Sequence, residues 1–520
     1  MSEKIICNSD PYEDVLEAKK HLIANVSSNV LLVIVISLIG FWMTPYLIRH
    51  MGVAVWSMVP LMTSVVSYFG LLTSGITSAV GRFVGICLKK GDNEGGNIYF
   101  NSAFFGMLFL FSFLSIFVFI LTVFLHRIFR IPEGYEFATR VLFVFIVVST
   151  FLTALSSPFF VSAFVRHRFD LGNLAGVVSR FFRVGLMVFC FTYFGASLVY
   201  VGLSYLGMTL ILFVSLILLT RILTPELHVR WKFFKRGVLY EMGVMSGWIT
   251  VDQIGTLLYL SIDLIIINLF LGAEAGGRYA PILQLVLLLQ VLSFTIGGIF
   301  APVAYSYIAN NEIEALSRQA GRSIKYVGLI MALFIGGMCG FSKPLLECWL
   351  GPSFAELNPL LWLLAFPQAI FLAINPLYNI NRGMNKVSVP AIATVIGGVL
   401  NLVLSILLVK YTTLGLYGVA IATVFSYAVR CIFFTPIYTA LILGQSATSF
   451  IKKVVPGLIM SVVVGLVCLV LSRTFYLASY LRLAVVGFVV CVLYIPLCYA
   501  AMLDRSDRAF LWSLAHRKKQ

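Results

Sequence analysis

Long apolar stretches constrain this chain more than any other feature of its sequence. About fourteen of them are long enough for a helix that crosses the bilayer core, which takes about 20 residues. We expect these spans at roughly 29–48, 54–77, 99–125, 138–163, 173–193, 197–220, 238–270, 276–307, 323–342, 357–380, 388–409, 414–443, 454–472 and 479–503. Only 11% of the 520 residues are charged, a share too small for a water-soluble protein of this length. The sequence therefore predicts an all-α polytopic membrane protein.

The basic residues predict the orientation of these spans. With a cytoplasmic N-terminus, about 25 of the 37 Lys and Arg residues fall on the cytoplasmic side and about nine outside. The largest cluster is RILTPELHVRWKFFKR, from Arg221 to Arg236. We therefore expect both termini in the cytoplasm. We interpret the net charge of +16 mainly as a consequence of the basic cytoplasmic loops, and secondly as an attraction to anionic membrane lipids. No nucleic acid partner is expected.

The sequence repeats itself at an offset of about 220 residues. HMGVAVWSMVP, around Gly52, corresponds to FLGAEAGGRYAPI, around Gly272, and FGASLVYVG, with Gly195, corresponds to LGLYGVAIA, with Gly415. Each repeat would hold about six helices, so the two halves have the same orientation in the membrane. We expect five segments. They are a cytoplasmic N-terminal tail (1–28), a first six-helix bundle (29–220), a basic cytoplasmic linker (221–237), a second six-helix bundle (238–443), and two extra transmembrane helices with a basic tail (444–520).

Several motifs of enzymes and ATP-driven pumps are missing from the sequence. No G-x-x-x-x-G-K-[ST] phosphate-binding loop occurs, so ATP is not expected as the direct energy source. No loop exceeds roughly 20 residues, which leaves no room for a soluble catalytic domain. The nine cysteines form no C-x-x-C pair, so we expect no metal centre. These observations argue against an enzyme, and no catalytic residues or bound cofactor are expected.

Two segments resemble a known transporter family. LIRHMGVAVWSMVPLMTSVVSYFGLLTSGITSAVGRFVG resembles a signature of the Wzx-type oligosaccharide-lipid flippases, through Gly52, Trp56, Gly75 and Arg82. SIDLIIINLFLGAEAGGRYAPI is similar to the junction of the seventh and eighth helices in that family, where Asp263 stands in the expected place. This family is also called the polysaccharide biosynthesis or O-antigen export family. It belongs to the multidrug/oligosaccharidyl-lipid/polysaccharide exporter (MOP) superfamily.

The resemblance implies both a fold and a function. It implies a V-shaped transporter of two parallel six-helix repeats plus two C-terminal helices, in a bacterial or archaeal cell (inner) membrane. Such a flippase would move a polyprenyl-diphosphate-linked oligosaccharide to the outer leaflet for O-antigen, capsule or exopolysaccharide synthesis. Its partners would include a polysaccharide polymerase and glycosyltransferases. One departure is that Thr73 and Ser74 stand where family members often carry an acidic residue.

Five arginines are candidate substrate-binding residues. Arg180 and Arg183 lie in the middle of an apolar span, one helical turn apart, and Arg430 lies deep in a later span. A guanidinium in the membrane needs partners or water, and its planar fork suits a diphosphate. The alternative is that these arginines pair with Asp252 or Asp263, or with backbone carbonyls, and hold helices together. Two further candidates lie near helix ends, where an interfacial role competes with substrate contact: Arg82 and Arg278.

Two membrane aspartates are candidate ion-coupling residues. Asp252 and Asp263 lie three helical turns apart and would share a helix face. A carboxyl group in the membrane can bind and release a coupling H⁺ or Na⁺, because desolvation disfavours its charged form. Ion pairing with the arginines is again the alternative.

Two other functions compete with lipid-linked oligosaccharide transport. A multidrug or small-cation antiporter of the same superfamily would place acidic residues in its cavity, whereas this sequence has three deep arginines and two deep aspartates. A non-transporting scaffold of a polysaccharide-synthesis complex would need no deep charges at all.

Overall fold

The computed structural model describes residues 11–245, 247–475, 479–505 and 507–508, so the outer parts of both predicted tails lie outside the described residues. Every regular element in this described part is a helix. Thirteen helices are long and apolar enough to cross a bilayer. A fourteenth span is added if the bent pair Asn358–Phe371 and Asn375–Gly383, with an angle of 44°, is one span. The prediction of an all-α protein with about fourteen spans is confirmed.

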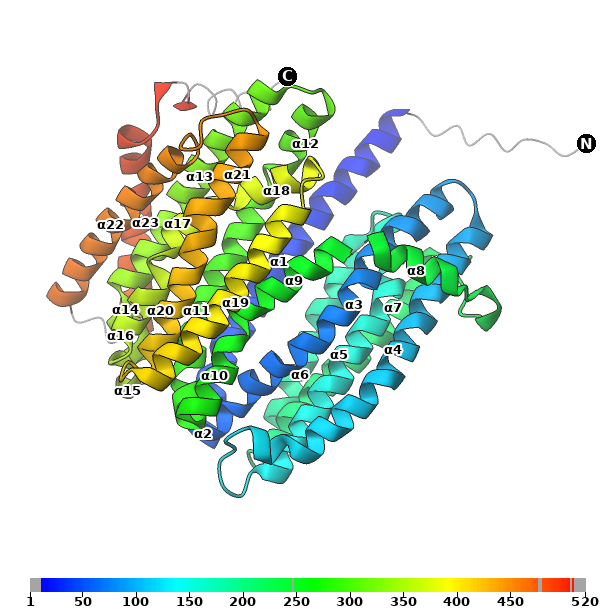
Figure 1. The fold of residues 1–520 in the computed structure, drawn as a ribbon, viewed down its shortest axis with the longest axis horizontal. Coiled ribbons are helices and arrows are strands. Elements are labelled where there is room, and N and C mark those ends of the chain that lie inside the picture. Colours follow the sequence, from blue (N-terminus) through cyan, green and yellow to red (C-terminus); the bar gives the residue numbers. More distant parts are fainter. Residues whose placement is uncertain (1–10, 246, 476–478, 506, 509–520) are drawn as a thin grey trace, which may run out of the picture. The chain divides into compact units, whose positions relative to one another are not determined.

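The chain divides into two compact units, Met1–Thr250 and Val251–Gln520. The boundary falls inside a helix, α9 (Gly247–Leu260), so the first unit also contains the basic linker. Helices α3, α5 and α7 run side by side in the first unit, with α4 against α3 and α5 and with α6 against α7 (Figure 1). The elements before α9 are α1 (Pro11–Met51), α2 (Val53–Trp56), α3 (Met58–Lys89), α4 (Asn93–Ile128), α5 (Glu136–Val165), α6 (Phe169–Phe194), α7 (Leu198–Leu223), η1 (Trp231–Phe233) and α8 (Arg236–Met245).

The second unit is also built of helices. Those up to the bent pair are α10 (Ile262–Leu271), α11 (Ala273–Gly298), α12 (Ala301–Ala309), α13 (Ile313–Gly340), α14 (Ser342–Leu350), α15 (Pro352–Ala355), α16 (Asn358–Ala365), α17 (Gln368–Phe371) and α18 (Asn375–Gly383). The remaining ones are α19 (Ser388–Tyr411), α20 (Leu416–Ala428), the π-helix η2 (Val429–Phe434), α21 (Thr435–Ile442), α22 (Ile451–Thr474) and α23 (Tyr480–Ala501).

Corresponding glycines of the two predicted repeats have the same backbone conformation. Gly52 precedes α2 with φ 80° and ψ 163°, and Gly272 precedes α11 with φ 96° and ψ 179°. Side chains with a Cβ atom rarely adopt a positive φ of this size, so glycine is the residue that permits these two helix junctions. The match supports the internal repeat that the sequence predicts.

Two asparagines of α4 fix the basic linker to the first unit. Asn97 donates from Nδ2 to the carbonyl of Glu226 and accepts at Oδ1 from the N–H of His228, both at 2.8 Å. Asn101 repeats this pattern with the carbonyl of His228 and the N–H of Arg230, also at 2.8 Å. The N–H and carbonyl groups of the linker backbone are therefore paired with side chains of α4, and buried or half-buried backbone groups need such partners.

Helices α13 and α22 form the most extensive helix pair of the second unit. Small residues permit their close approach: a Cβ at Gly457 would lie 2.7 Å from the backbone of Gly328, and one at Gly336 would lie 2.7 Å from the carbonyl of Ser461. Small residues at such contacts are typical of membrane helix packing. The hydrophobic effect does not drive helices together in lipid, so close van der Waals contact between the helix backbones stabilises the pair. The first of the two extra C-terminal helices is therefore an integral part of the second unit.

A buried ion cluster ties the segment after α23 to α13. Lys325 donates from Nζ to Asp507 at 2.6 Å and to Asp504 at 3.0 Å, and Tyr326 donates to Asp507 at 3.1 Å. Lys325 is 8% exposed and Asp507 3%. Burial raises the pKa of Asp507, but the hydrogen bond and charge of Lys325 lower it more, and its net pKa lies below the ordinary value. The stabilisation from Asp507 is therefore present above a pH of about 4 and is lost as the pH falls through the lowered native pKa.

Replacing Lys325 with Met is expected to destabilise the second unit. The substitution removes the ammonium group and leaves the buried Asp507 carboxylate without its cation, which costs about 3–5 kcal/mol of unfolding free energy. Thermal unfolding of the detergent-solubilised protein measures this effect. Adding Asp507→Leu should restore most of the stability, because no buried charge then remains at position 507. An unchanged melting temperature for Lys325→Met would contradict the structural role of the cluster.

Candidate functional site

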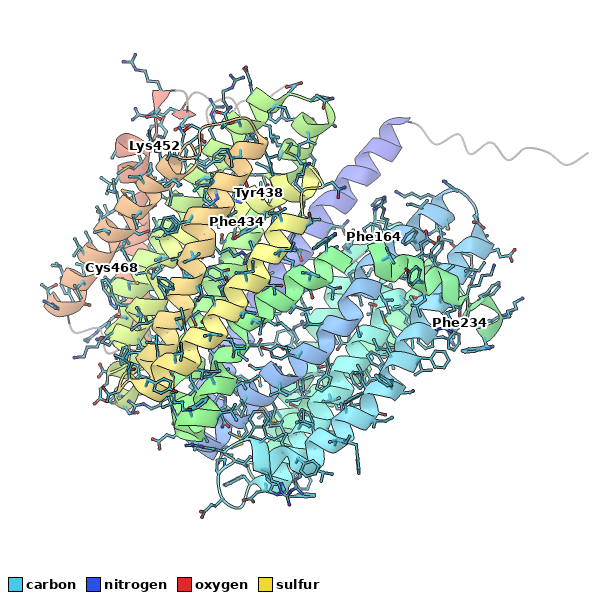
Figure 2. The ribbon with its side chains drawn as sticks, viewed as in Figure 1. Phe164, Phe234, Phe434, Tyr438, Lys452 and Cys468 are labelled. Carbon is cyan, nitrogen blue, oxygen red and sulfur yellow. The ribbon has the colours of Figure 1, made fainter. Side chains whose placement is uncertain are left out.

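The first unit contains a cavity of about 580 Å³ lined by residues of α1, α3, α5, α6 and α7. Two of the predicted arginines line it, Arg82 from α3 and Arg180 from α6. Phe164, labelled in Figure 2, contributes to its wall near the end of α5. Neutral hydrogen-bonding side chains also line it: Thr77, Thr153, Ser156, Ser157 and Asn173. The cavity thus combines two cations with hydroxyl and amide groups among apolar helices.

Arg180 is oriented by its own helix. Its Nη1 donates to the carbonyl of Gly176, one turn earlier, at 2.8 Å. A Cβ at position 176 would lie 3.2 Å from that nitrogen, so the absence of a side chain leaves room for the guanidinium. Arg180 takes part in none of the ion pairs found among the described residues. Within the part of the chain that the structure describes, its recorded partner is thus a carbonyl dipole, and its other N–H groups can serve an anionic ligand.

Arg183, one turn further along α6, is placed differently. Its guanidinium carbon lies 3.5 Å from the ring centroid of Tyr205 on α7, a cation–π contact. Its Nε is buried without a hydrogen-bond partner among the described residues. The residue is not part of the cavity lining. The two arginines that the sequence places on one helix face therefore have different surroundings, because a long side chain extends well beyond its own turn.

Arg430 is enclosed in the second unit. It lies in the π-helix η2 and is 9% exposed. Its guanidinium carbon lies 5.2 Å from the ring centroid of Tyr378 and 5.9 Å from those of Tyr259 and Tyr427. Aromatic faces stabilise a cation that has lost its water. A π-helical turn within an α-helix often marks a functional position.

Asp252 lies between two arginines of the second unit. Its carboxylate oxygens are 3.9 Å from Nη2 of Arg430 and 4.0 Å from Nη2 of Arg382. Thr394 donates to the same carboxylate at 2.9 Å. Both arginine distances exceed a hydrogen bond, so the group is an electrostatic cluster of two cations and one anion. It carries one positive charge in surplus.

Asp263 is completely buried in the second unit and is surrounded by neutral groups. Tyr279 donates to Oδ2 at 2.9 Å, Asn401 donates to Oδ1 at 3.2 Å, and the Thr423 hydroxyl lies 2.8 Å from Oδ2. No basic side chain forms an ion pair with Asp263 in the described part of the chain. A carboxylate buried without a counter-charge is unfavourable, so this position favours a bound proton or cation.

The Thr423 hydroxyl lies among several oxygen atoms near Asp263. The single hydroxyl hydrogen of Thr423 is shared among Asp263 Oδ2 at 2.8 Å, Asn401 Oδ1 at 3.1 Å and the carbonyl of Val419 at 3.1 Å. The only other hydroxyl recorded near Asn401 Oδ1, within the described residues, is that of Ser405 at 3.4 Å. The carboxylate, amide, hydroxyl and carbonyl oxygens gathered here are of the kinds that hard cations bind.

Two predicted arginines lie nearer the surface. Arg82 is exposed although it lines the cavity of the first unit. Arg278 forms an ion pair with Glu356 at 3.6 Å, with side-chain exposures of 37% and 81%. A pair this open to solvent contributes little to stability.

Several residues of these sites escaped the sequence reasoning. Tyr205 and Thr423 carry no charge and lie in apolar spans, where such residues usually serve packing. Arg382 lies in a polar stretch of the sequence, where a basic residue is interpreted as a sign of a cytoplasmic loop. Asn401 is recognisable as a polar residue in a span, yet its partner Asp263 lies 138 positions away. Only the tertiary structure shows these contacts.

The fold defines the class of protein as a polytopic membrane protein with the fold of the MOP transporters. The chain resembles the inward closed conformation of the lipid II flippase MurJ, with a TM-score of 0.66 and 16% identity over 91% of this chain and 100% of that one. It also resembles an inward-facing multidrug resistance MATE family transporter of the MOP superfamily, with a TM-score of 0.67 and 15% identity over 81% of this chain and 98% of that one. These likenesses establish the fold.

The family is established by the sequence. The model of the family described as "Polysaccharide biosynthesis protein" matches residues 22–306, more than half of the chain, and the chain belongs to that family. This confirms the resemblance found in the sequence, and it agrees with the expectation of a transporter rather than an enzyme.

Two curated relatives support this membership. The uncharacterized membrane protein EpsK of Bacillus subtilis is 29% identical over 93% of this chain and 96% of its own length. The probable low-salt glycan biosynthesis flippase Agl15 of Haloferax volcanii is 26% identical over 36% of this chain and 39% of its own length.

Proposed function

We propose that the protein flips a polyprenyl-diphosphate-linked oligosaccharide from the cytoplasmic to the outer leaflet of a bacterial or archaeal cell membrane. The observation that supports this most is the cavity of the first unit, where Arg82 and Arg180 lie among membrane helices. A diphosphate headgroup cannot cross hydrocarbon unaided, because its charge and its sugars would lose their water. A cationic cavity with hydroxyl groups replaces that water.

The residues of the cavity suit the parts of such a substrate. The guanidinium of Arg180 can donate two parallel hydrogen bonds to phosphate oxygens. Hydroxyl and amide side chains such as Ser157 and Asn173 can bond sugar hydroxyls. The polyprenyl tail would stay in lipid, beside the exposed apolar surfaces of the helices. The product would then be used by a polysaccharide polymerase, after glycosyltransferases have built the oligosaccharide.

Asp263 is the residue that we assign to ion coupling. It has no positively charged partner among the described residues, so H⁺ or Na⁺ can neutralise it and leave again. Asp252 has two arginines within 4.0 Å, so its charge already has positive partners and it is less suited to this cycle. The membrane arginines Arg183, Arg278 and Arg430 then serve helix contacts and interfaces.

The decisive test is transport by the purified protein. Proteoliposomes should flip a fluorescent polyprenyl-diphosphate oligosaccharide under an H⁺ or Na⁺ gradient, or down the substrate gradient alone, without ATP. Extrusion of small cationic dyes without any flipping would favour the multidrug antiporter instead. Inactivity with both substrates, together with loss of surface polysaccharide in cells that lack the protein, would favour the scaffold.

Cysteine labelling in intact cells tests the proposed topology, in which both termini are cytoplasmic. Single cysteines in the linker of residues 224–235 should react with a membrane-impermeant reagent only after permeabilisation, since basic loops stay inside. Single cysteines near Ser353, in the short helix α15 that precedes α16, should react without permeabilisation. Labelling of the linker from outside would reverse the orientation.

A further inference from the structure

Four aromatic side chains meet in the first unit, where the basic linker lies beside α4. The ring of Trp231, in η1, stacks on that of Phe234 with the centroids 5.1 Å apart. The rings of Phe105 and Phe109, one turn apart on α4, meet Trp231 edge to face at 4.8 and 5.7 Å. Figure 2 labels Phe234, the residue that follows η1. These four residues are called the aromatic cluster below. About half of the surface of Trp231 and of Phe109 is exposed, 56% and 54%.

The local packing holds the aromatic cluster in place. The backbone N–H of Lys235 donates to the Ser102 hydroxyl of α4 at 3.0 Å, in addition to the bonds from the two α4 asparagines described above. On the following helix, α8, Leu239 lies directly against α4, since a Cβ at Gly106 would be 2.6 Å from its Cδ1. The surface is therefore formed before a partner arrives, and little ordering is needed for binding.

The position of the cluster along α4 indicates its level in the membrane. α4 has 36 residues and is about 54 Å long, whereas the hydrocarbon core of a bilayer is about 30 Å thick. The helix begins with the polar turns NEGGNIYFNS, and its predominantly apolar part starts at Ala103. Phe105 and Phe109 stand in the first two turns of that apolar part. The aromatic cluster therefore lies at the edge of the hydrocarbon, the level at which tryptophan rings are enriched in membrane proteins.

Four exposed basic residues accompany these rings along the linker: Arg230, Lys232, Lys235 and Arg236. None of the four takes part in the ion pairs found among the described residues. The two nearest acidic residues along the chain have partners elsewhere. Glu226 pairs with Arg166 at 2.9 Å, and Glu241 accepts a hydrogen bond from Tyr99 at 3.2 Å. The linker surface therefore has a surplus of positive charge beside its aromatic rings.

We propose that this linker surface binds anionic phospholipids of the adjacent leaflet. The rings of the aromatic cluster lie at the edge of the hydrocarbon, and the four basic side chains contact the lipid phosphates. Aromatic rings combined with lysine and arginine are typical of protein segments that lie in the membrane interface. Basic side chains close to the membrane surface are attracted by anionic headgroups. The proposal does not depend on the transport function, because lipid binding is measured without transport.

The test is a lipid titration of the purified full-length protein in detergent. Short-chain phosphatidylglycerol and phosphatidylcholine are added separately, and the rise in melting temperature gives each apparent affinity. The test variant is Lys232→Gln/Lys235→Gln. The control variant is Lys89→Gln/Lys90→Gln, which removes the same charge from two exposed lysines just before α4. The start of α4 lies about 18 Å along the helix axis from Phe105, which exceeds the Debye length of about 8 Å.

Phosphatidylglycerol should bind the wild type and the control variant alike and the test variant about 10- to 30-fold more weakly, because two basic side chains near the lipid surface are lost. Phosphatidylcholine should bind all three proteins weakly. Equal affinities of the test and control variants for phosphatidylglycerol, or equal binding of the two lipids by the wild type, would overturn the proposal.

Trp231 provides a second measurement, made in phosphatidylglycerol vesicles whose acyl chains are brominated near the glycerol. The difference in fluorescence between the wild type and Trp231→Phe isolates the emission of Trp231, and phenylalanine keeps a ring in the aromatic cluster. Bromine should quench this emission, because the ring lies at the edge of the hydrocarbon. Quenching by aqueous iodide in place of bromine would show the ring in water. It would overturn the lipid surface and favour an acidic protein as the partner of the linker.

Discussion

Replacing Asp263 with Asn is expected to abolish the dependence of transport on an ion gradient while the protein remains folded. Asparagine has nearly the same shape and can still accept hydrogen bonds from Tyr279 and Thr423. It cannot bind a proton, and it offers a cation no negative charge. Coupling between two sites typically changes an affinity by about 5- to 150-fold. We expect the acceleration of transport by the ion gradient to fall by a factor in this range.

Proteoliposomes with separate H⁺ and Na⁺ gradients provide the measurement and identify the ion. Thr423→Ser is the matched control, because it keeps the hydroxyl beside Asp263, and it should keep the coupling. Thr423→Val removes that oxygen and should weaken it. If Asp263→Asn transported at the wild-type rate with unchanged ion dependence, Asp263 would have only a structural role.

Replacing Arg180 with Ala is expected to remove most of the affinity for the diphosphate headgroup. A hydrogen bond to a charged group contributes about 1.5–3 kcal/mol, which corresponds to roughly 10- to 150-fold in affinity. Arg180→Lys should keep part of the function, since a point charge still attracts phosphate. Surface polysaccharide in cells and substrate binding by the purified variant measure the effect. A cysteine at position 180 should react with a water-soluble cationic thiol reagent, and substrate should protect it.

Arg183 provides the comparison for Arg180, since it lies on the same helix but against Tyr205. Arg183→Ala loses the cation–π contact, worth about 0.5–2 kcal/mol, and should lower the melting temperature more than the substrate affinity. Arg180→Ala should show the opposite pattern. Normal binding by Arg180→Ala would exclude the cavity role of this residue. A binding defect in Arg183→Ala at normal stability would move the substrate site toward α7.

The amino-acid sequence alone predicted the helical class, the approximate spans and the family. These features are local or periodic. A continuous apolar run of about 20 residues forms a helix in a membrane, because a helix satisfies the backbone hydrogen bonds within the run itself. The repeat was also readable, since Gly52 and Gly272 mark junctions that require the same positive φ. The buried charges were recognisable as unusual for the same reason, because a charge in an apolar run stands out without any knowledge of its neighbours.

Only the tertiary structure decided what each of those charges does. Arg180 and Arg183 share a helix face, yet one lines a cavity and the other stacks on Tyr205. Asp263 meets Thr423, 160 positions away, and Lys325 meets Asp507, 182 positions away. Such contacts depend on how neighbouring helices are rotated and how far they are shifted along their axes. Helical periodicity fixes the angle between residues of one helix, but it leaves that rotation and shift open, and packing between helices sets them.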